Sequence, residues 1–191
     1  VKTNRARVFS NKEISVDAVL ASTCLPQFFQ AIEIDGQHYW DGGYMGNPPL
    51  FPLIENTSVT DLLLIKINSI NIDEVPTTAR DISDRIDEIS FNSSLINEMH
   101  LIHYRNALVR KGIQLDEDKD VASREIFVHS ISAHEALGHL KYSSKMNTSW
   151  QFLSDLKNKG RLYAEKWLEN EFHLVGLKSS FDVEKNFFDK Y

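Results

Sequence analysis

An aspartate followed by two glycines, Asp41-Gly42-Gly43, is the part of the sequence best suited to chemistry. It follows the run Ile32 to Trp40, in which Asp35-Gly36 is a hairpin-turn signal. Glycine adopts positive φ without Cβ strain, so we expect a sharp turn directly after Asp41 that leaves its side chain at the rim. Asn47, which precedes two prolines, is expected to form a rigid turn next. A carboxylate held in this way can act as a general base.

The residues on both sides of Asp41 form a longer array that resembles the second half of the patatin-like phospholipase domain. In order, the array contains Val19 to Pro26, Phe28-Phe29, the hairpin, Asp41-Gly42-Gly43 and Asn47-x-Pro49, at the spacing typical of that family. The resemblance covers about residues 7 to 55. No single part is specific by itself, because Asp-Gly is a common turn dipeptide. The whole array carries the resemblance.

The resemblance implies a lipid acyl hydrolase that cleaves carboxylic esters, chiefly of phospholipids, with a Ser–Asp dyad and without a metal or cofactor. Asp41 would be the general base, and Gly42, Gly43 and Asn47 would support its turn. In the family a G-x-S-x-G nucleophile motif and a glycine-rich oxyanion loop precede this point, and the sequence contains neither. We therefore expect Val1 to be an interior point of a longer parent chain. We also expect this chain alone to be catalytically inactive.

Residues beyond the array resemble the C-terminal extension of one group of bacterial patatin-like proteins, a module of unknown role. The matching stretches are Thr77–Ile82, Glu88–Leu95, Ser144–Trp150, Gly160-Arg161 and Trp167-Leu168. The predicted division is therefore a catalytic-domain portion over residues 1–70, without its nucleophile half, and a mainly helical extension over 71–191 packed on it. The predicted fold class is α/β. It is part of a three-layer α/β/α domain with a mostly parallel sheet, followed by helices.

Hydrophobic periodicity predicts the elements that position these residues. We expect a helix over Val16–Thr23 that Pro26 stops, a hairpin over Ala31–Trp40, and strands over Leu62–Ile67 and Ile126–Ile131. The nearly unbroken apolar run of the first strand is typical of a strand buried on both faces. A charged loop is expected at Asp116–Asp120.

Two long helical patterns follow residue 70. The first begins near Thr78, ends at Gly112 and is one helix or a broken pair, with isoleucines and Met99 along one face. The second begins near Thr148-Ser149 and is expected to dock through a stripe of apolar and small residues: Trp150, Leu153, Gly160, Ala164 and Trp167. An alternative reading of the chain is a non-catalytic binding or scaffold module that uses this stripe.

Composition excludes several classes of protein. The net charge of −6 argues against nucleic acid, which requires a basic face, and the single cysteine excludes an internal disulfide. No apolar run reaches the length of a membrane span, and the N-terminus does not resemble a signal peptide. We expect a cytoplasmic or peripheral membrane protein of a bacterium, with a lipid or other ester substrate. An unpaired edge on the Leu62–Ile67 strand would favour self-association.

Other candidate chemical groups are weaker. His134 and His139 are five positions apart, which splays them by about 140° on a helix, so a zinc pair is not expected. His129 lies in a predicted strand, and we expect these histidines to be exposed or satisfied polar residues. Cys24 fits a small buried residue better than a nucleophile. His38 is expected to be an exposed hairpin histidine.

Overall fold

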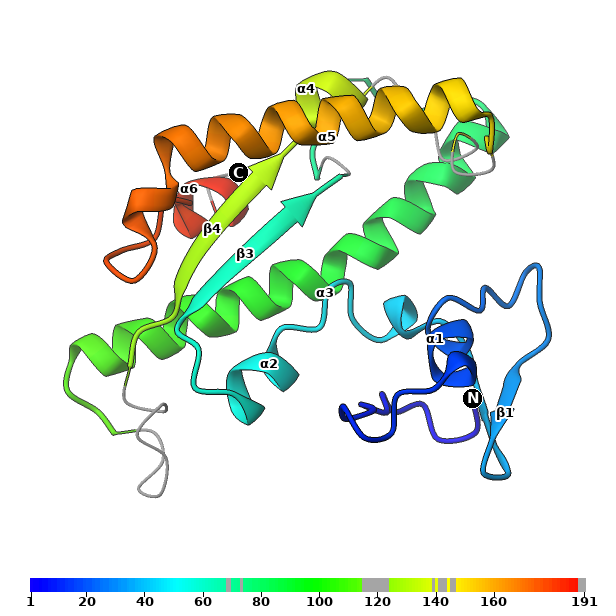
Figure 1. Ribbon diagram of the computed structural model, residues 1–191, viewed down its shortest axis with the longest axis horizontal. Coiled ribbons are helices and arrows are strands. Elements are labelled where there is room, and N and C mark those ends of the chain that lie inside the picture. Colours follow the sequence, from blue (N-terminus) through cyan, green and yellow to red (C-terminus); the bar gives the residue numbers. More distant parts are fainter. Residues whose placement is uncertain are drawn as a thin grey trace. The chain divides into compact units, whose positions relative to one another are not determined.

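The computed structural model describes residues 1–67, 70–72, 74–114, 124–138, 140, 144 and 147–188 (Figure 1). The chain forms two compact units. The first comprises Val1–Thr57 and Ser90–Glu98, and the second comprises Ser58–Ile89 and Met99–Tyr191. The fold is mixed α/β with a parallel sheet and helices, as predicted. The charged loop expected at Asp116–Asp120 lies outside the described residues.

The first unit begins with the predicted helix and hairpin. Helix α1 spans Val16–Ser22, is capped by the Ser15 hydroxyl, which accepts from the Ala18 N–H at 3.1 Å, and buries Ala18 and Ala21. Strands β1 (Ile32–Ile34) and β2 (Gln37–Tyr39) pair antiparallel around Asp35-Gly36. Both turn residues have positive φ, 49° and 72°, as a tight two-residue hairpin turn requires. The 3-10 helix η1 (Gly42–Tyr44) and helix α2 (Phe51–Asn56) follow.

Helix α3 is a single helix over Ala79–Arg110, so the broken pair is excluded. The Thr78 hydroxyl accepts from the Asp81 N–H at 3.2 Å and donates to its carboxylate at 2.6 Å, the reciprocal contact expected of a capped start. At the other end Gly112 has a φ of 74°, which closes the helix. The predicted apolar face is buried only in part. Met99 and Ile102 are buried, whereas the isoleucines of the first turns are exposed: Ile82, Ile86 and Ile89.

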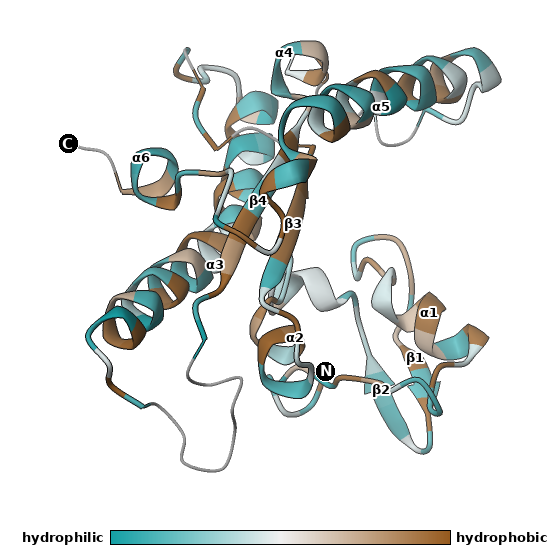
Figure 2. Cartoon of the chain, turned by 60° about the vertical axis from the view of Figure 1, so that its left-hand side comes forward, coloured by the Kyte–Doolittle hydropathy of each residue, from teal (hydrophilic) through white to brown (hydrophobic). Residues whose placement is uncertain are grey.

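The second unit contains the predicted parallel strands, β3 (Asp61–Lys66) and β4 (Phe127–Ser132), paired from Asp61↔Phe127 to Lys66↔Ser132. Leu62 and Leu64 are buried, but Leu63 is 44% exposed and Ile65 72% exposed. The prediction that this strand is buried on both faces is therefore wrong. Side chains alternate along a strand, and within the described residues one face of β3 lacks the cover that its apolar residues suggest. Figure 2 shows the hydrophobic colouring along β3.

The remaining helices of the second unit are α4 (His134–Leu137), α5 (Trp150–Asn170) and α6 (Val183–Phe187), with the 3-10 helix η4 at Phe172–Leu174. Helix α5 packs on β4 (Figure 1). Its predicted docking stripe is buried only at one end, because Trp167 is 7% exposed and Trp150 is 83% exposed. In the described part of the chain, no helix combines the length and apolar character that a bilayer crossing requires.

Candidate active site

Asp41 is held from two sides at the start of the 3-10 turn. Its backbone N–H donates to the Cys24 carbonyl at 2.9 Å, just after α1, and its Oδ1 accepts from the Gly43 N–H at 2.7 Å. The side chain is half-buried. Among the described residues, Oδ2 has no hydrogen-bond partner. One oxygen of the carboxylate is therefore fixed, and the other is available to accept a proton.

The two glycines after Asp41 do not act through positive φ, so that expectation is wrong. The positive-φ glycines of the described chain are Gly36, Gly112 and Gly176. A right-handed 3-10 turn bends the chain instead, with the Asp41 carboxylate as its cap. A Cβ on Gly43 would lie 2.9 Å from the Phe91 ring and 3.0 Å from Asp41 Oδ1, whereas a Cβ on Gly42 would meet nothing within 4 Å. Gly43 is thus required by close approach, and Gly42 is not.

A short stretch of α3, within the same unit, supports the loop that follows Asp41. The Phe91 ring packs against Tyr44 with centroids 5.2 Å apart, and the Tyr44 hydroxyl donates to Gln27 at 2.8 Å. The backbone N–H of Asn47 donates to the Ser94 hydroxyl at 2.9 Å. Asn47 therefore contributes its backbone to this contact. The loop is clamped by side chains more than forty positions later in the sequence.

Glu98 completes this support. Its Oε2 accepts from the N–H groups of Leu50 and Phe51, at 2.6 and 3.0 Å, and so satisfies the start of α2, whose own N-cap residue has no capping side chain. Burial raises the pKa of Glu98, although these two hydrogen bonds act in the opposite direction. Phe91, Ser94 and Glu98 recur at three- and four-residue steps. That spacing places them on one helix face but does not reveal what the face contacts.

The other candidates near Asp41 occupy unremarkable positions. Cys24 is 3% exposed, and its thiol donates to the Gln30 carbonyl at 3.1 Å, which confirms a small buried residue. His38 lies opposite Glu33 in the hairpin, with Nε2 3.7 Å from Oε2 and a side chain that is 40% exposed. The geometry gives neither residue a catalytic partner within the described chain.

The structure describes two of the three histidines considered for metal binding, His129 and His134. His129 is 1% exposed in β4, with both ring nitrogens hydrogen-bonded, to Asp61 and to Ser180. That confirms a satisfied polar histidine at this position. His134 begins α4, and His139 lies outside the described residues. No three His, Cys, Asp or Glu side chains of the described chain group around a possible metal position.

In a comparison with known protein families, the first part of the chain matches one family model. Residues 2–54 match the family model described as patatin-like phospholipase. The match contains α1, the hairpin, Asp41-Gly42-Gly43 and Asn47, and it confirms the family resemblance drawn from the sequence over about residues 7 to 55. No curated protein and no solved structure matches the chain. This part of the chain is therefore similar to a family of lipid acyl hydrolases.

Proposed function

We propose that this chain supplies the general base of a serine-dependent lipid acyl hydrolase, and that the base is Asp41. One observation carries the proposal. Within the segment that matches the patatin-like phospholipase family, Asp41 has one oxygen fixed by the Gly43 N–H and the other without a partner among the described residues. The nucleophilic serine and the oxyanion donors would belong to residues of the parent protein outside these 191, because the sequence has no G-x-S-x-G motif.

In the proposed reaction, the serine oxygen attacks the carbonyl carbon of a lipid ester and Asp41 Oδ2 takes the hydroxyl proton. The negative charge on the carbonyl oxygen is stabilised by backbone N–H donors of the glycine-rich loop. The tetrahedral intermediate collapses, the ester C–O bond breaks, and Asp41 returns the proton to the leaving alcohol. Water then releases the acyl group by the same route.

The support residues have distinct parts in this proposal. Gly43 allows the Asp41 carboxylate and the Phe91 ring to lie close to its own backbone, and Gly42 is the first residue of the 3-10 turn, where a side chain would meet nothing. Asn47 anchors the end of the loop through its backbone bond to Ser94. The carboxylate therefore needs no histidine to hold it, because the Gly43 N–H holds one oxygen and the Cys24 carbonyl holds the backbone of Asp41.

The proposal also includes the organisation of the parent protein. Residues 1–70 would be the C-terminal part of the catalytic domain, and residues 71–191 would be a helical extension of a bacterial protein that acts in the cytoplasm or at a membrane surface. Phospholipid esters are the proposed substrates, and no nucleic-acid partner is proposed for a chain with a net charge of −6. The 191-residue chain alone would not hydrolyse esters through Asp41, because it lacks the serine partner of that residue.

The alternative, a non-catalytic interaction module, is favoured by one observation. Trp150, at the start of α5, is 83% exposed, and exposed tryptophans are enriched at protein interfaces. A parent protein without a G-x-S-x-G motif upstream of Val1, and without esterase activity, would favour this alternative over the hydrolase.

The test is ester hydrolysis by the parent protein with Asp41→Asn, measured with a chromogenic ester and with phospholipid vesicles. Loss of the base should lower kcat/KM by about 10²- to 10⁴-fold. Asp35→Asn is the matched control, because Asp35 is an exposed hairpin-turn residue of the same segment and Asn tolerates its positive φ. Asp35→Asn should retain activity. Turnover by Asp41→Asn close to that of the unaltered parent would contradict the proposal.

A further inference from the structure

A serine, a histidine and an aspartate from separate segments of the second unit form a hydrogen-bonded chain. The Ser180 hydroxyl lies 3.0 Å from His129 Nδ1, and His129 Nε2 lies 3.0 Å from Asp61 Oδ1. The parallel register pairs Leu63 with His129, so Asp61 and His129 lie on the same face of the sheet, two positions apart. Ser180 comes from the segment beside β4, where the Phe181 N–H donates to the Val128 carbonyl at 3.1 Å.

The hydrogen bonds fix the direction in which the proton can move. Burial raises the pKa of Asp61, but hydrogen bonds from the Gly176 N–H, His129 and Thr60 lower it by more, so the pKa lies below its ordinary value. Asp61 is then a carboxylate and can only accept, so His129 Nε2 carries the ring proton. Nδ1 is left with a lone pair that faces the Ser180 hydroxyl. Serine hydrolases use the same order of groups to activate the serine, although there Nε2 faces the serine and Nδ1–H bonds to the aspartate.

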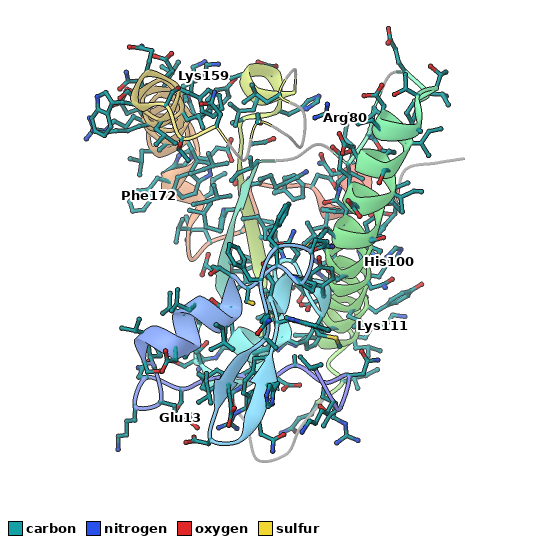
Figure 3. All side chains as sticks on the ribbon, turned by 90° about the vertical axis from the view of Figure 1, so that its right-hand side faces the viewer. Glu13, Arg80, His100, Lys111, Lys159 and Phe172 are labelled. Carbon is teal, nitrogen blue, oxygen red and sulfur yellow. The ribbon has the colours of Figure 1, made fainter. Side chains whose placement is uncertain are left out.

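The surroundings of His129 contain an unused donor and an apolar wall. Trp167 packs edge-on against His129 with ring centroids 6.1 Å apart, and it is only 7% exposed. Its Nε1–H is buried without a hydrogen-bond partner among the described residues. A buried donor left unpaired costs free energy, which a hydrogen bond to a ligand carbonyl oxygen would recover. Phe172, labelled in Figure 3, packs on Trp167 with ring centroids 5.9 Å apart and is 56% exposed.

We propose that Ser180, His129 and Asp61 form a nucleophilic serine site that accepts an acyl group from a carboxylic ester with an apolar acyl chain. The site does not use Asp41. Trp167 Nε1–H donates to the acyl carbonyl oxygen, and Asp61 is a positioning residue that holds the imidazole. Trp167 and Phe172 provide the apolar wall for the acyl chain. Ser180 is half-buried, so part of this residue is exposed to an approaching ester.

The proposed step balances as an acyl transfer. The Ser180 Oγ–C bond forms while the hydroxyl proton moves to His129 Nδ1, and the carbonyl carbon becomes tetrahedral. The ester C–O bond then breaks, and the leaving alcohol takes the proton from Nδ1. The products are an O-acyl serine and a free alcohol, and water hydrolyses the acyl serine through the same imidazole. No oxidant, metal or cofactor takes part in this sequence.

The test is acylation of the full-length protein by p-nitrophenyl acetate, read by mass spectrometry. Trypsin releases residues 179–185 as one peptide with both Ser179 and Ser180, and fragment ions separate the two positions. We expect an acetyl group on Ser180. Ser180→Ala should remove it, and Asp61→Asn should lower the acetylation rate at least about tenfold, because the imidazole loses its orienting partner. Trp167→Phe, which keeps the ring and removes the donor, should lower the rate at least about tenfold.

Ser179→Ala is the matched control. Ser179 is the adjacent serine, and its hydroxyl accepts from the Val128 backbone N–H at 3.0 Å, whereas Ser180 bonds to His129. If the imidazole activates the serine, Ser179→Ala should leave acetylation of Ser180 unchanged. Thermal unfolding of each variant separates lost reactivity from lost folding. Unmodified Ser180 in the folded protein together with no release of p-nitrophenolate, or an acetylation rate that Asp61→Asn does not change, would overturn the proposal.

Discussion

The position of Asp41 depends on a few atoms around it. The Gly43 N–H fixes one carboxylate oxygen, and the Cys24 carbonyl holds the backbone of the same residue. Gly43 is confined between that carboxylate and the Phe91 ring, while Gly42 faces open space. Two neighbouring glycines that look equivalent in the sequence therefore have different requirements.

This difference gives a prediction for a pair of variants. Gly43→Ala should destabilise the protein by about 1–3 kcal/mol, because the new methyl group overlaps Phe91 and the Asp41 oxygen. Gly42→Ala should change stability little, since its methyl group meets nothing. Chemical denaturation of both variants, and ester hydrolysis in the parent protein, measure the effect. Equal free energies of unfolding for the two variants would contradict this account.

Helix α3 supports the loop that carries Asp41. Residues 90–98 of this helix belong to the first unit, where Glu98 caps α2 and Ser94 holds Asn47. The helix is well defined by its own capping at Thr78 and Gly112, so it presents these side chains from a rigid support. The loop that carries Asp41 therefore depends on a helix much further along the chain.

Glu98 gives an element-scale prediction. Glu98→Ala leaves the Leu50 and Phe51 N–H groups without this acceptor and should destabilise the protein by about 1–2 kcal/mol. Glu55→Ala, at an exposed position of α2, is the control and should have a small effect. Urea titration of both variants measures the difference. Similar losses in the two variants would show that the Glu98 contact does not stabilise α2.

The pKa of Glu98 predicts how this contact varies with pH. Burial raises its pKa in the folded state above the ordinary value of 4.5, so the folded state favours the protonated form. The stabilisation that Glu98 contributes through this shift is present below pH 4.5 and is lost as the pH rises through the folded-state pKa. Relative to Glu98→Gln, which does not titrate, the unaltered protein should lose stability across that interval. A difference that is constant with pH, or that increases, would contradict the shift.

At the scale of the whole molecule, the exposed face of β3 is the main unsatisfied feature. In the described chain β3 pairs with β4 alone, and Ile65 and Ile67 are 72% and 64% exposed. They line a groove of about 490 Å³ together with apolar residues of α5: Phe152, Leu153 and Leu156. An apolar strand with an unpaired edge is a site for association between chains.

We therefore expect the 191-residue chain to self-associate through β3. Its elution volume in size-exclusion chromatography should decrease with increasing concentration, and Ile65→Gln should reduce this dependence. Ile82→Gln is the control, because Ile82 is also an exposed isoleucine but lies on α3. Elution that is independent of concentration, or an equal response to both substitutions, would count against association through this strand.

The sequence by itself determined the features that depend on neighbouring residues. The start of α3 near Thr78, the Asp35-Gly36 turn, both parallel strands and the family resemblance around Asp41 follow from local residue types and periodicity. Short-range signals suffice there, because a cap or a tight turn is satisfied within a few residues.

Only the tertiary structure decided which distant residues meet. The contacts of Glu98 with the start of α2, of Phe91 with Gly43, and of His129 with Asp61 and Ser180 join positions that are 47 to 68 residues apart in the sequence. The exposed face of β3 also contradicts what its apolar run predicts. These contacts depend on the path of the whole chain. Hydrophobic periodicity indicates that one face of an element is to be buried, but it does not indicate which residues bury it.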